Sequence, residues 1–160
     1  MATTNECITS AKVFFDRLKG EKCWTVIAGP GSGSMAKLAF GAKIKRDRKI
    51  RNEKLTDEQR EFTGEFVLFI MNTFWEIGNS KEKICNNEDS NDEDGLMLSG
   101  LNQLIGKYLI SIDFLNGFCE FRLNFNDGLY LKLKSDANLD IDNNYSLSYM
   151  GTTINLGLPH

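Results

Sequence analysis

The stretch KYLISIDFLNGFCEFRLNFNDGLYLKLK, residues 107–134, decides the fold. Apolar and polar side chains alternate in each of its three runs, which predicts β-strands with one buried face. The breaks between the runs are Asn116-Gly117 and Asp127-Gly128, two dipeptides typical of hairpins, and the first predicts a two-residue turn. The stretch therefore predicts an antiparallel β meander. Its expected inward side chains are those of Tyr108, Ile110, Ile112, Phe114, Phe121, Leu123, Phe125, Leu129, Leu131 and Leu133.

Further strands are expected on both sides of this stretch. CWTVIA (residues 23–28) is rich in β-branched and aromatic residues, which favours a strand. The alternation of Leu38, Phe40, Ala42 and Ile44 with mostly polar residues predicts another strand. FVLFIMNTFWEI (residues 66–77) is the most apolar run and predicts one buried central strand, and GNSKEKIC after it predicts a hairpin return. YSLSYM and TINLGL, around Gly151, are expected to extend the meander.

Three short helical segments are expected. An apolar stripe of Ala11, Phe14, Phe15 and Leu18 predicts an N-terminal helix, capped by Thr9 or Ser10 and ended by Gly20. Thr56-x-x-Gln59 matches a capping box and predicts a helical turn over residues 56–61. LMLSGLNQLIG predicts a helix that ends at Gly106.

These elements predict one α+β domain over residues 1–160, mainly an antiparallel β meander of about eight strands in one or two sheets, with two or three short helices. Its expected parts are an N-terminal helix and hairpin (1–50), a charged connection (51–65) and a C-terminal meander (101–158). Crossover units with a parallel sheet are not expected.

Composition narrows the possible functions. The formal net charge is −3, which implies no general attraction to nucleic acid or to anionic membranes. No apolar run reaches the roughly 18 residues that span a bilayer. The beginning of the sequence lacks the features of a secretory signal, and the cysteines are scattered, which together predict a cytoplasmic protein with reduced thiols. His160 is the only histidine, so neither a zinc site nor a histidine-based catalytic dyad is expected, and no cofactor is expected.

The glycine-rich segment AGPGSGSMA (residues 28–36) matches the dinucleotide fingerprint as Gly31-x-Gly33-x-x-Ala36. That fingerprint requires a helix after the glycines, whereas the residues that follow alternate like a strand. A turn between strands is therefore the preferred interpretation, and a loop that binds a nucleotide or another small molecule is the alternative. The residues of this alternative loop are Gly29, Gly31, Ser32, Gly33 and Ser34.

KIKRDRKIR (residues 43–51) carries six basic residues and one acidic residue. Such a run could contact phosphates and so bind nucleic acid. The run contains no aromatic residue for base stacking, and the whole chain is acidic, so a solvated surface is the preferred interpretation. The residues of this alternative patch are Lys43, Lys45, Arg46, Arg48, Lys49 and Arg51.

NNEDSNDEDG (residues 86–95) predicts a solvated acidic loop. Its spacing resembles an EF-hand around Gly95, but Leu101 occupies the position of the bidentate glutamate, so no metal site is expected. An excess of negative charge in a surface loop favours contact with a basic partner protein. The candidate partner-binding residues are Glu88, Asp89, Asp92, Glu93 and Asp94.

Residues 101–156 resemble a pattern found among small uncharacterised bacterial proteins: a G-K/R-x-I-x-x-I strand, a strand that ends in aromatic-x-D/N-G, and another alternating strand. Several such proteins look like immunity or accessory components of toxin systems. The resemblance implies a binding role and supplies no catalytic residue.

The sequence thus ranks three hypotheses. The first is a non-enzymatic protein-binding module, in one form an immunity-like antagonist that covers a toxin's basic active site with the acidic loop. The second is a nucleotide or small-molecule binder, with or without enzymatic activity, that uses residues 29–34. The third is nucleic-acid binding through residues 43–51.

Overall fold

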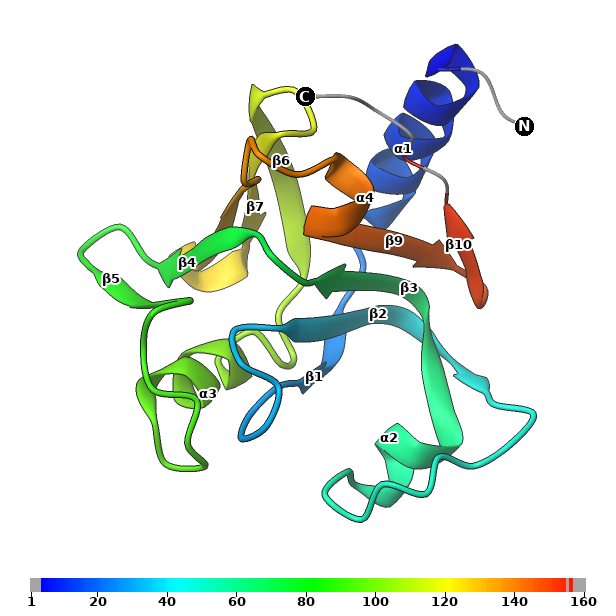
Figure 1. Cartoon of the computed structure of the whole chain (residues 1–160), viewed down its shortest axis with the longest axis vertical. Helices are drawn as coiled ribbons and strands as arrows, with labels where there is room; N and C mark the ends of the chain where they lie inside the picture. Colours follow the sequence, from blue (N-terminus) through cyan, green and yellow to red (C-terminus); the bar gives the residue numbers. More distant parts are fainter. Residues whose placement is uncertain (1–3, 155, 157–160) are drawn as a thin grey trace.

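The computed structural model describes residues 4–154 and 156 of the chain. Within them, ten strands form two antiparallel five-stranded sheets, and the predicted α+β class is confirmed (Figure 1). The first sheet has the order β1–β2–β3–β9–β10, with β1 Cys23–Ile27, β2 Ala36–Lys45, β3 Phe62–Ile70, β9 Tyr145–Tyr149 and β10 Thr152–Ile154. The second has the order β5–β4–β8–β7–β6, with β5 Lys83–Asn86, β4 Phe74–Gly78, β8 Tyr130–Lys134, β7 Glu120–Phe125 and β6 Leu109–Asn116.

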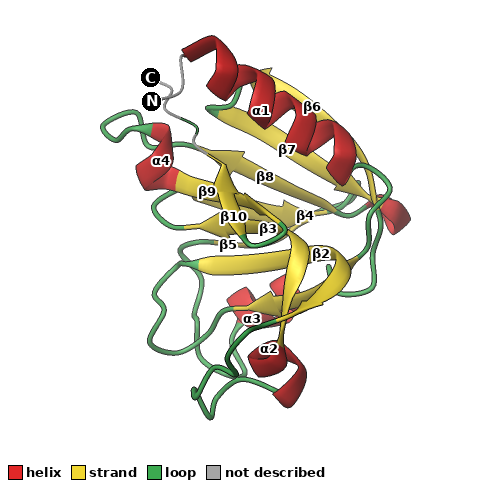
Figure 2. Ribbon diagram, turned by 90° about the vertical axis from the view of Figure 1, so that its right-hand side faces the viewer, coloured by secondary structure: helices red, strands yellow, loops and turns green. Residues whose placement is uncertain are grey.

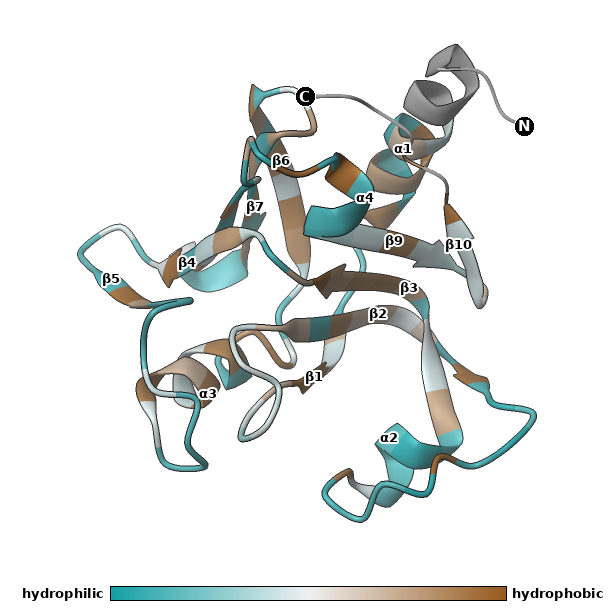
Figure 3. Ribbon diagram, in the orientation of Figure 1, coloured by the Kyte–Doolittle hydropathy of each residue, from teal (hydrophilic) through white to brown (hydrophobic). Residues whose placement is uncertain are grey.

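The two sheets share one core. Phe40 of β2 stacks on Phe125 of β7 with ring centroids 6.2 Å apart, and Phe121 of β7 meets Tyr145 of β9 edge to face at 5.4 Å. Because these four side chains come from both sheets and are almost fully buried, the inner faces are packed against each other. In the hydropathy colouring, hydrophobic and hydrophilic segments alternate along the strands, and the connections before α2 and before α3 are mainly hydrophilic (Figure 3).

Helix α1 (Thr4–Leu18) lies across β6 and β7 (Figure 2). The predicted apolar stripe is confirmed, since Ala11, Phe14, Phe15 and Leu18 are all buried. Phe15 contacts Phe121 of the second sheet, whereas Phe14 contacts Phe66 of the first, so the helix joins the two sheets. The predicted start was wrong: the helix begins at Thr4 and not after a cap at residue 9 or 10. The apolar stripe on which the prediction rested begins only at Ala11.

Strands β6, β7 and β8 form the predicted meander. The turn at Asn116-Gly117 has three residues rather than two, because Asn116 pairs with Glu120 after a bulge. The 3-10 turn η1 (Asn126–Gly128) makes the second hairpin, with positive φ at both Asp127 and Gly128. The predicted inward residues of β7 and β8 are buried.

The prediction for β6 was partly wrong. Tyr108, Ile110 and Phe114 are exposed by 48, 60 and 44%, and Leu109 is buried instead. The reason is twofold: a bulge between Leu109 and Ser111 shifts the alternation, and β6 is the outermost strand of its sheet.

The apolar run over residues 66–77 is two strands in different sheets and not one central strand. Between β3 and β4 the chain turns around the backbone carbonyl of Asn144, which accepts from the amides of Met71 and Asn72 and from the Thr73 hydroxyl at 2.8 Å. A turn satisfied by buried partners needs no glycine or proline, and therefore leaves no signal in the sequence.

The meander also ends earlier than predicted. After β8, the short helix α4 (Ile141–Asn144) leads the chain across to the first sheet, where β9 pairs with β3 and β10 pairs with β9. In β2 the expected inward residues Leu38 and Phe40 are buried, but Ala39, expected on the wet face, is buried too. A bulge after Phe40 then shifts the register and leaves Ala42 exposed.

The expected charged connection over residues 51–65 contains helix α2 (Asp57–Glu61) and the beginning of β3. The predicted capping box is confirmed: the Gln59 amide donates to the Thr56 hydroxyl at 3.1 Å, and the Thr56 amide donates to the Gln59 side chain at 3.0 Å. Helix α3 (Leu96–Asn102) lies in the segment where a helix was predicted, but it ends before the predicted stop at Gly106. Strands β4 and β5 form the predicted hairpin. None of the helices described is long and apolar enough to cross a membrane.

Candidate functional site

A groove runs along the outer edge of β1. It consists of two adjoining hollows of about 550 and 630 Å³. One wall is the chain that leads into α2, and the other is α3 with the turn after it. The residues common to both hollows are Ile27, Ala28, Lys54, Leu55 and Leu98. Apolar side chains therefore line the middle of the groove, and Lys54 supplies a cation.

The glycine-rich loop closes one end of this groove with Gly29, Gly31 and Ser32. It joins β1 to β2, which pair antiparallel, so the predicted turn is confirmed and no helix follows the glycines. The Ser32 hydroxyl donates to the carbonyl of Gly29 at 2.6 Å and accepts from the Gly29 amide at 3.1 Å. These two hydrogen bonds fix the loop without a ligand. The helix that the dinucleotide fingerprint requires after the glycines is absent.

The acidic loop lies against the glycine-rich loop. The side-chain amide of Asn91 donates to the carbonyls of Gly29 and Gly33, at 3.4 and 3.1 Å. The Trp75 indole also donates to this loop, at the carbonyl of Ser34 and a distance of 3.0 Å. The two loops, predicted as separate candidates, therefore form one structural unit.

Hydrogen bonds within the acidic loop also fix its conformation. The Asn86 amide donates to the Asp89 carboxylate at 2.7 Å, the Ser90 hydroxyl donates to Asp92 at 3.1 Å, and the Met97 amide donates to the carbonyl of Ser90. Burial, and to a smaller extent the Asp89 carboxylate, raise the pKa of the Cys85 thiol to about 11. The loop is thus ordered by its own contacts and by those to the glycine-rich loop.

The five predicted partner-binding residues do not form one cluster. Asp92, Glu93 and Asp94 are exposed next to one another, and Glu93 lines the groove. Asp89 is half-buried, and its carboxylate accepts a hydrogen bond from the backbone amide of Asn86 in the same loop. Glu88 lies instead at a hollow on the second sheet. The acidic surface suited to a partner is therefore residues 92–94.

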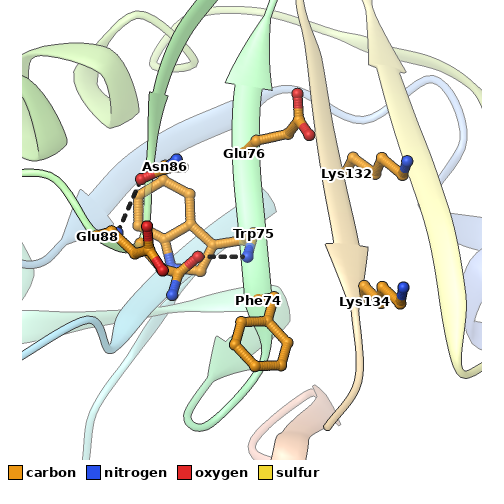
Figure 4. Close-up of a pocket in the computed structure, with 8 residues that line it drawn as sticks. Phe74, Trp75, Glu76, Asn86, Glu88, Lys132 and Lys134 are labelled. Carbon is orange, nitrogen blue, oxygen red and sulfur yellow. Dashed lines mark hydrogen bonds between the residues drawn. The ribbon is translucent and has the colours of Figure 1, made fainter.

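The hollow beside Glu88 is shallow, with a volume of about 220 Å³. Figure 4 shows Glu76 on β4 and two lysines, Lys132 and Lys134, on β8, with the exposed ring of Phe74 at one end. The Tyr130 hydroxyl donates to Glu76 at 2.9 Å, and Lys132 pairs with Glu120 at 3.5 Å. Because two carboxylates and two ammonium groups line the hollow, this surface has no strong preference for a charged ligand.

The basic run is partly neutralised by α2. Lys43 pairs with Glu58, and Lys49 lies 3.5 Å from both Asp57 and Glu61. The other four basic residues of the run, Lys45, Arg46, Arg48 and Arg51, form no ion pair within the described residues. Nucleic-acid binding through this run stays a prediction, with fewer free cations than the sequence indicates.

The loop over residues 86–95 carries five acidic residues close together in the sequence. No ion pair within residues 4–154 involves Glu88, Asp89, Asp92, Glu93 or Asp94, whereas the acidic residues of α2 are all paired. Among the described residues, no three or more His, Cys, Asp or Glu side chains are arranged so that they could hold a metal ion.

The sequence analysis did not identify several residues that line the groove. Lys54, Leu55 and Leu98 carry no motif, and only the fold brings them together. Gln59 was identified as a capping residue, but its side chain also donates to the Thr25 hydroxyl at 2.9 Å and to the carbonyl of Val26 at 3.2 Å. Asn91 resembles the other polar residues of its loop in sequence.

Comparison with protein-family models, with curated proteins and with solved structures finds no match for this chain.

Proposed function

We propose that this protein is a protein-binding module whose acidic loop contacts a basic surface of its partner. The observation that carries the proposal is the combination of order and unpaired charge: Asp92, Glu93 and Asp94 are exposed, lack ion pairs among the described residues, and sit on a loop held by Asn91. A preorganised loop loses little conformational entropy on binding. The electric field of its three carboxylates increases the rate at which it associates with a positively charged partner.

One concrete form of this function is an immunity-like antagonist. Such a protein would place the acidic loop in the basic active site of a toxin and so exclude its substrate. The groove beside Glu93 could then receive an apolar side chain of the partner, since Leu55 and Leu98 line it. This form rests on the resemblance of residues 101–156 and on charge complementarity. Location in the cytoplasm stays a prediction.

The proposal is tested by quantitative capture from a lysate of the source cells. The immobilised wild-type protein is compared with the variant D92N/E93Q/D94N, at low and at high salt. We expect a partner that is enriched on the wild type, depleted on the variant and released by salt, because both changes weaken the same charge contacts.

The matched control is D47N/E82Q/D140N. It removes the same charge from three exposed acidic residues that form no ion pair among the described residues. The control should capture the partner as the wild type does. Equal capture by all three proteins, or equal loss on both variants, would rule out a specific role for the loop.

A second candidate function is ligand binding in the groove. Its hollows of about 550 and 630 Å³ fall in the size range of small-molecule sites. A nucleotide at one hundred times its dissociation constant would stabilise the protein by about 2.7 kcal/mol, which a thermal melt detects readily. No stabilisation by any member of a nucleotide panel would remove this candidate for nucleotides.

A further inference from the structure

A small cavity lies on the outer face of the first sheet. Residues of β1, β2, β3 and α2 line it, and its volume is about 10 Å³, close to the space that one water molecule needs. Gln59 of α2 is fixed to β1 here, because its side chain donates to the Thr25 hydroxyl and to the carbonyl of Val26. The cavity therefore admits one small particle.

Two residues of this cavity have buried donors that lack a protein acceptor. Trp24 and Arg46 both line it, and neither the indole Nε1 nor the guanidinium Nε forms a hydrogen bond within the described residues. Of the oxygens nearby, the Thr25 hydroxyl accepts from Gln59, and the Gln59 side chain accepts from the Thr56 amide. Native proteins pair nearly all buried N–H groups with a protein atom, a water molecule or an ion. These two N–H groups therefore require an acceptor that enters from solvent.

The charges that line the cavity are all positive. They belong to Lys37 and Arg46, which form no ion pair among the described residues, and no acidic residue lines the cavity. Lys43, whose ammonium group lies 5.3 Å from the ring centroid of Trp24, is already paired with Glu58. Burial lowers the pKa of both lining cations, and Arg46 lowers that of Lys37 further. A negative charge at this place would offset the repulsion between them.

We propose that this cavity binds a single-atom anion, of which chloride is the common example, through the N–H groups of Trp24 and Arg46. The indole, guanidinium and ammonium groups that line it donate hydrogen bonds and accept none, so they suit an anion. A water molecule would need acceptors for its own hydrogens, and sulfate and phosphate exceed the space. Bound chloride would also favour the charged form of Lys37, which is disfavoured most in a buffer without chloride. This proposal does not depend on the function proposed for the acidic loop.

The first test follows the indole N–H signals of the ¹⁵N-labelled protein by NMR while sodium chloride replaces sodium gluconate at constant ionic strength. Trp75 is an internal control, because its indole already donates to the carbonyl of Ser34 at 3.0 Å. The variant Trp24→Phe assigns the two signals. We expect the Trp24 signal to shift until it saturates and the Trp75 signal to stay in place. A Trp24 signal that does not move, or two signals that move alike, would overturn the proposal.

The same titration with sodium phosphate tests the size of the ligand. We expect no saturable shift of the Trp24 signal, because the cavity has space for one atom of about the size of water. A saturable shift with phosphate and none with chloride would contradict a single-atom ligand.

The second test is thermal unfolding in chloride and in gluconate at equal ionic strength. A ligand that binds only the folded chain raises the melting temperature. Chloride should therefore stabilise the wild type more than it stabilises Arg46→Gln, which lacks the guanidinium group. The matched control is Arg48→Gln, at an exposed arginine that also forms no ion pair among the described residues, and it should respond as the wild type does. An equal response of all three proteins would show that chloride does not bind at Arg46.

Discussion

The side-chain amide of Asn91 donates to the backbone carbonyl of Gly33 at 3.1 Å, which fastens the acidic loop to the turn between β1 and β2. A second bond from the same amide reaches the carbonyl of Gly29 at 3.4 Å. These residues are about sixty positions apart in the sequence, so the contact links elements of the two sheets.

Replacing Asn91 with Ala should release the acidic loop. We expect the free energy of unfolding to decrease by about 1 kcal/mol, the usual net loss for a partly exposed hydrogen bond. Amide hydrogen exchange should also quicken at residues 88–95 and 29–34 together. Asn102→Ala, at an exposed position near the groove, is the control. Faster exchange in only one of the two loops would show that they are not coupled.

Gly100 on α3 packs against β5 too closely for any side chain. A Cβ at this position would overlap the Sγ of Cys85 and lie 3.2 Å from its Cβ. We expect Gly100→Ala to destabilise the protein by about 1–3 kcal/mol in urea unfolding, as overpacked core variants do.

The double variant Gly100→Ala with Cys85→Ala removes the overlapping sulfur. It should be more stable than Gly100→Ala alone, although Cys85→Ala by itself destabilises. If the two losses simply added, the contact between α3 and β5 would not be the cause of the destabilisation.

Lys37 lies half-buried on the outer face of the first sheet. Burial, and to a smaller extent the nearby Arg46, lower the pKa of its ammonium group from the ordinary 10.5. The ammonium group also lies 5.2 Å from the ring centroid of Phe69, a favourable contact. The lowered pKa means that burial and Arg46 disfavour the charged form of Lys37 in the folded protein.

Lys37→Met should therefore raise the melting temperature at neutral pH. The unfolded chain holds this proton more tightly, so the stability of the wild type rises with pH between the lowered pKa and 10.5. We expect the advantage of Lys37→Met to shrink over that range. Lys45→Met, which removes an exposed charge at the end of β2, is the control and should show neither effect.

The buried thiols should be unreactive in the folded protein. Burial raises the pKa of Cys23 to about 12, and burial with Asp89 raises that of Cys85 to about 11. Because the thiolate is the reactive form, iodoacetamide at mildly alkaline pH should modify neither cysteine in native protein and both in urea. Mass spectrometry of the labelled peptides measures this. Labelling of native Cys85 at the rate seen in urea would contradict the packing of α3 on β5.

Local chemistry explains which elements were predictable. The capping box of Thr56 and Gln59 and the turn at Asp127-Gly128 depend on adjacent residues, and the structure confirms both. The stripe from Ala11 to Leu18 was also predictable, because one helix face meets one core.

The errors share a different cause. The break between β3 and β4 depends on Asn144, about seventy positions away, and the exposed face of β6 depends on its place at the end of a sheet. The groove combines residues from β1, the segment before α2, and α3. Sequence periodicity contains no information on which strand lies at an edge or on which distant segments become neighbours.

The role of the acidic loop is tested by the association kinetics of the captured partner with immobilised wild type and with D92N/E93Q/D94N, across a range of salt. We expect the wild type to associate fastest at low salt and to slow as salt increases. The variant should associate slowly at every salt concentration, with a dissociation rate close to that of the wild type. Equal association rates for the two proteins at low salt would contradict a docking role for residues 92–94.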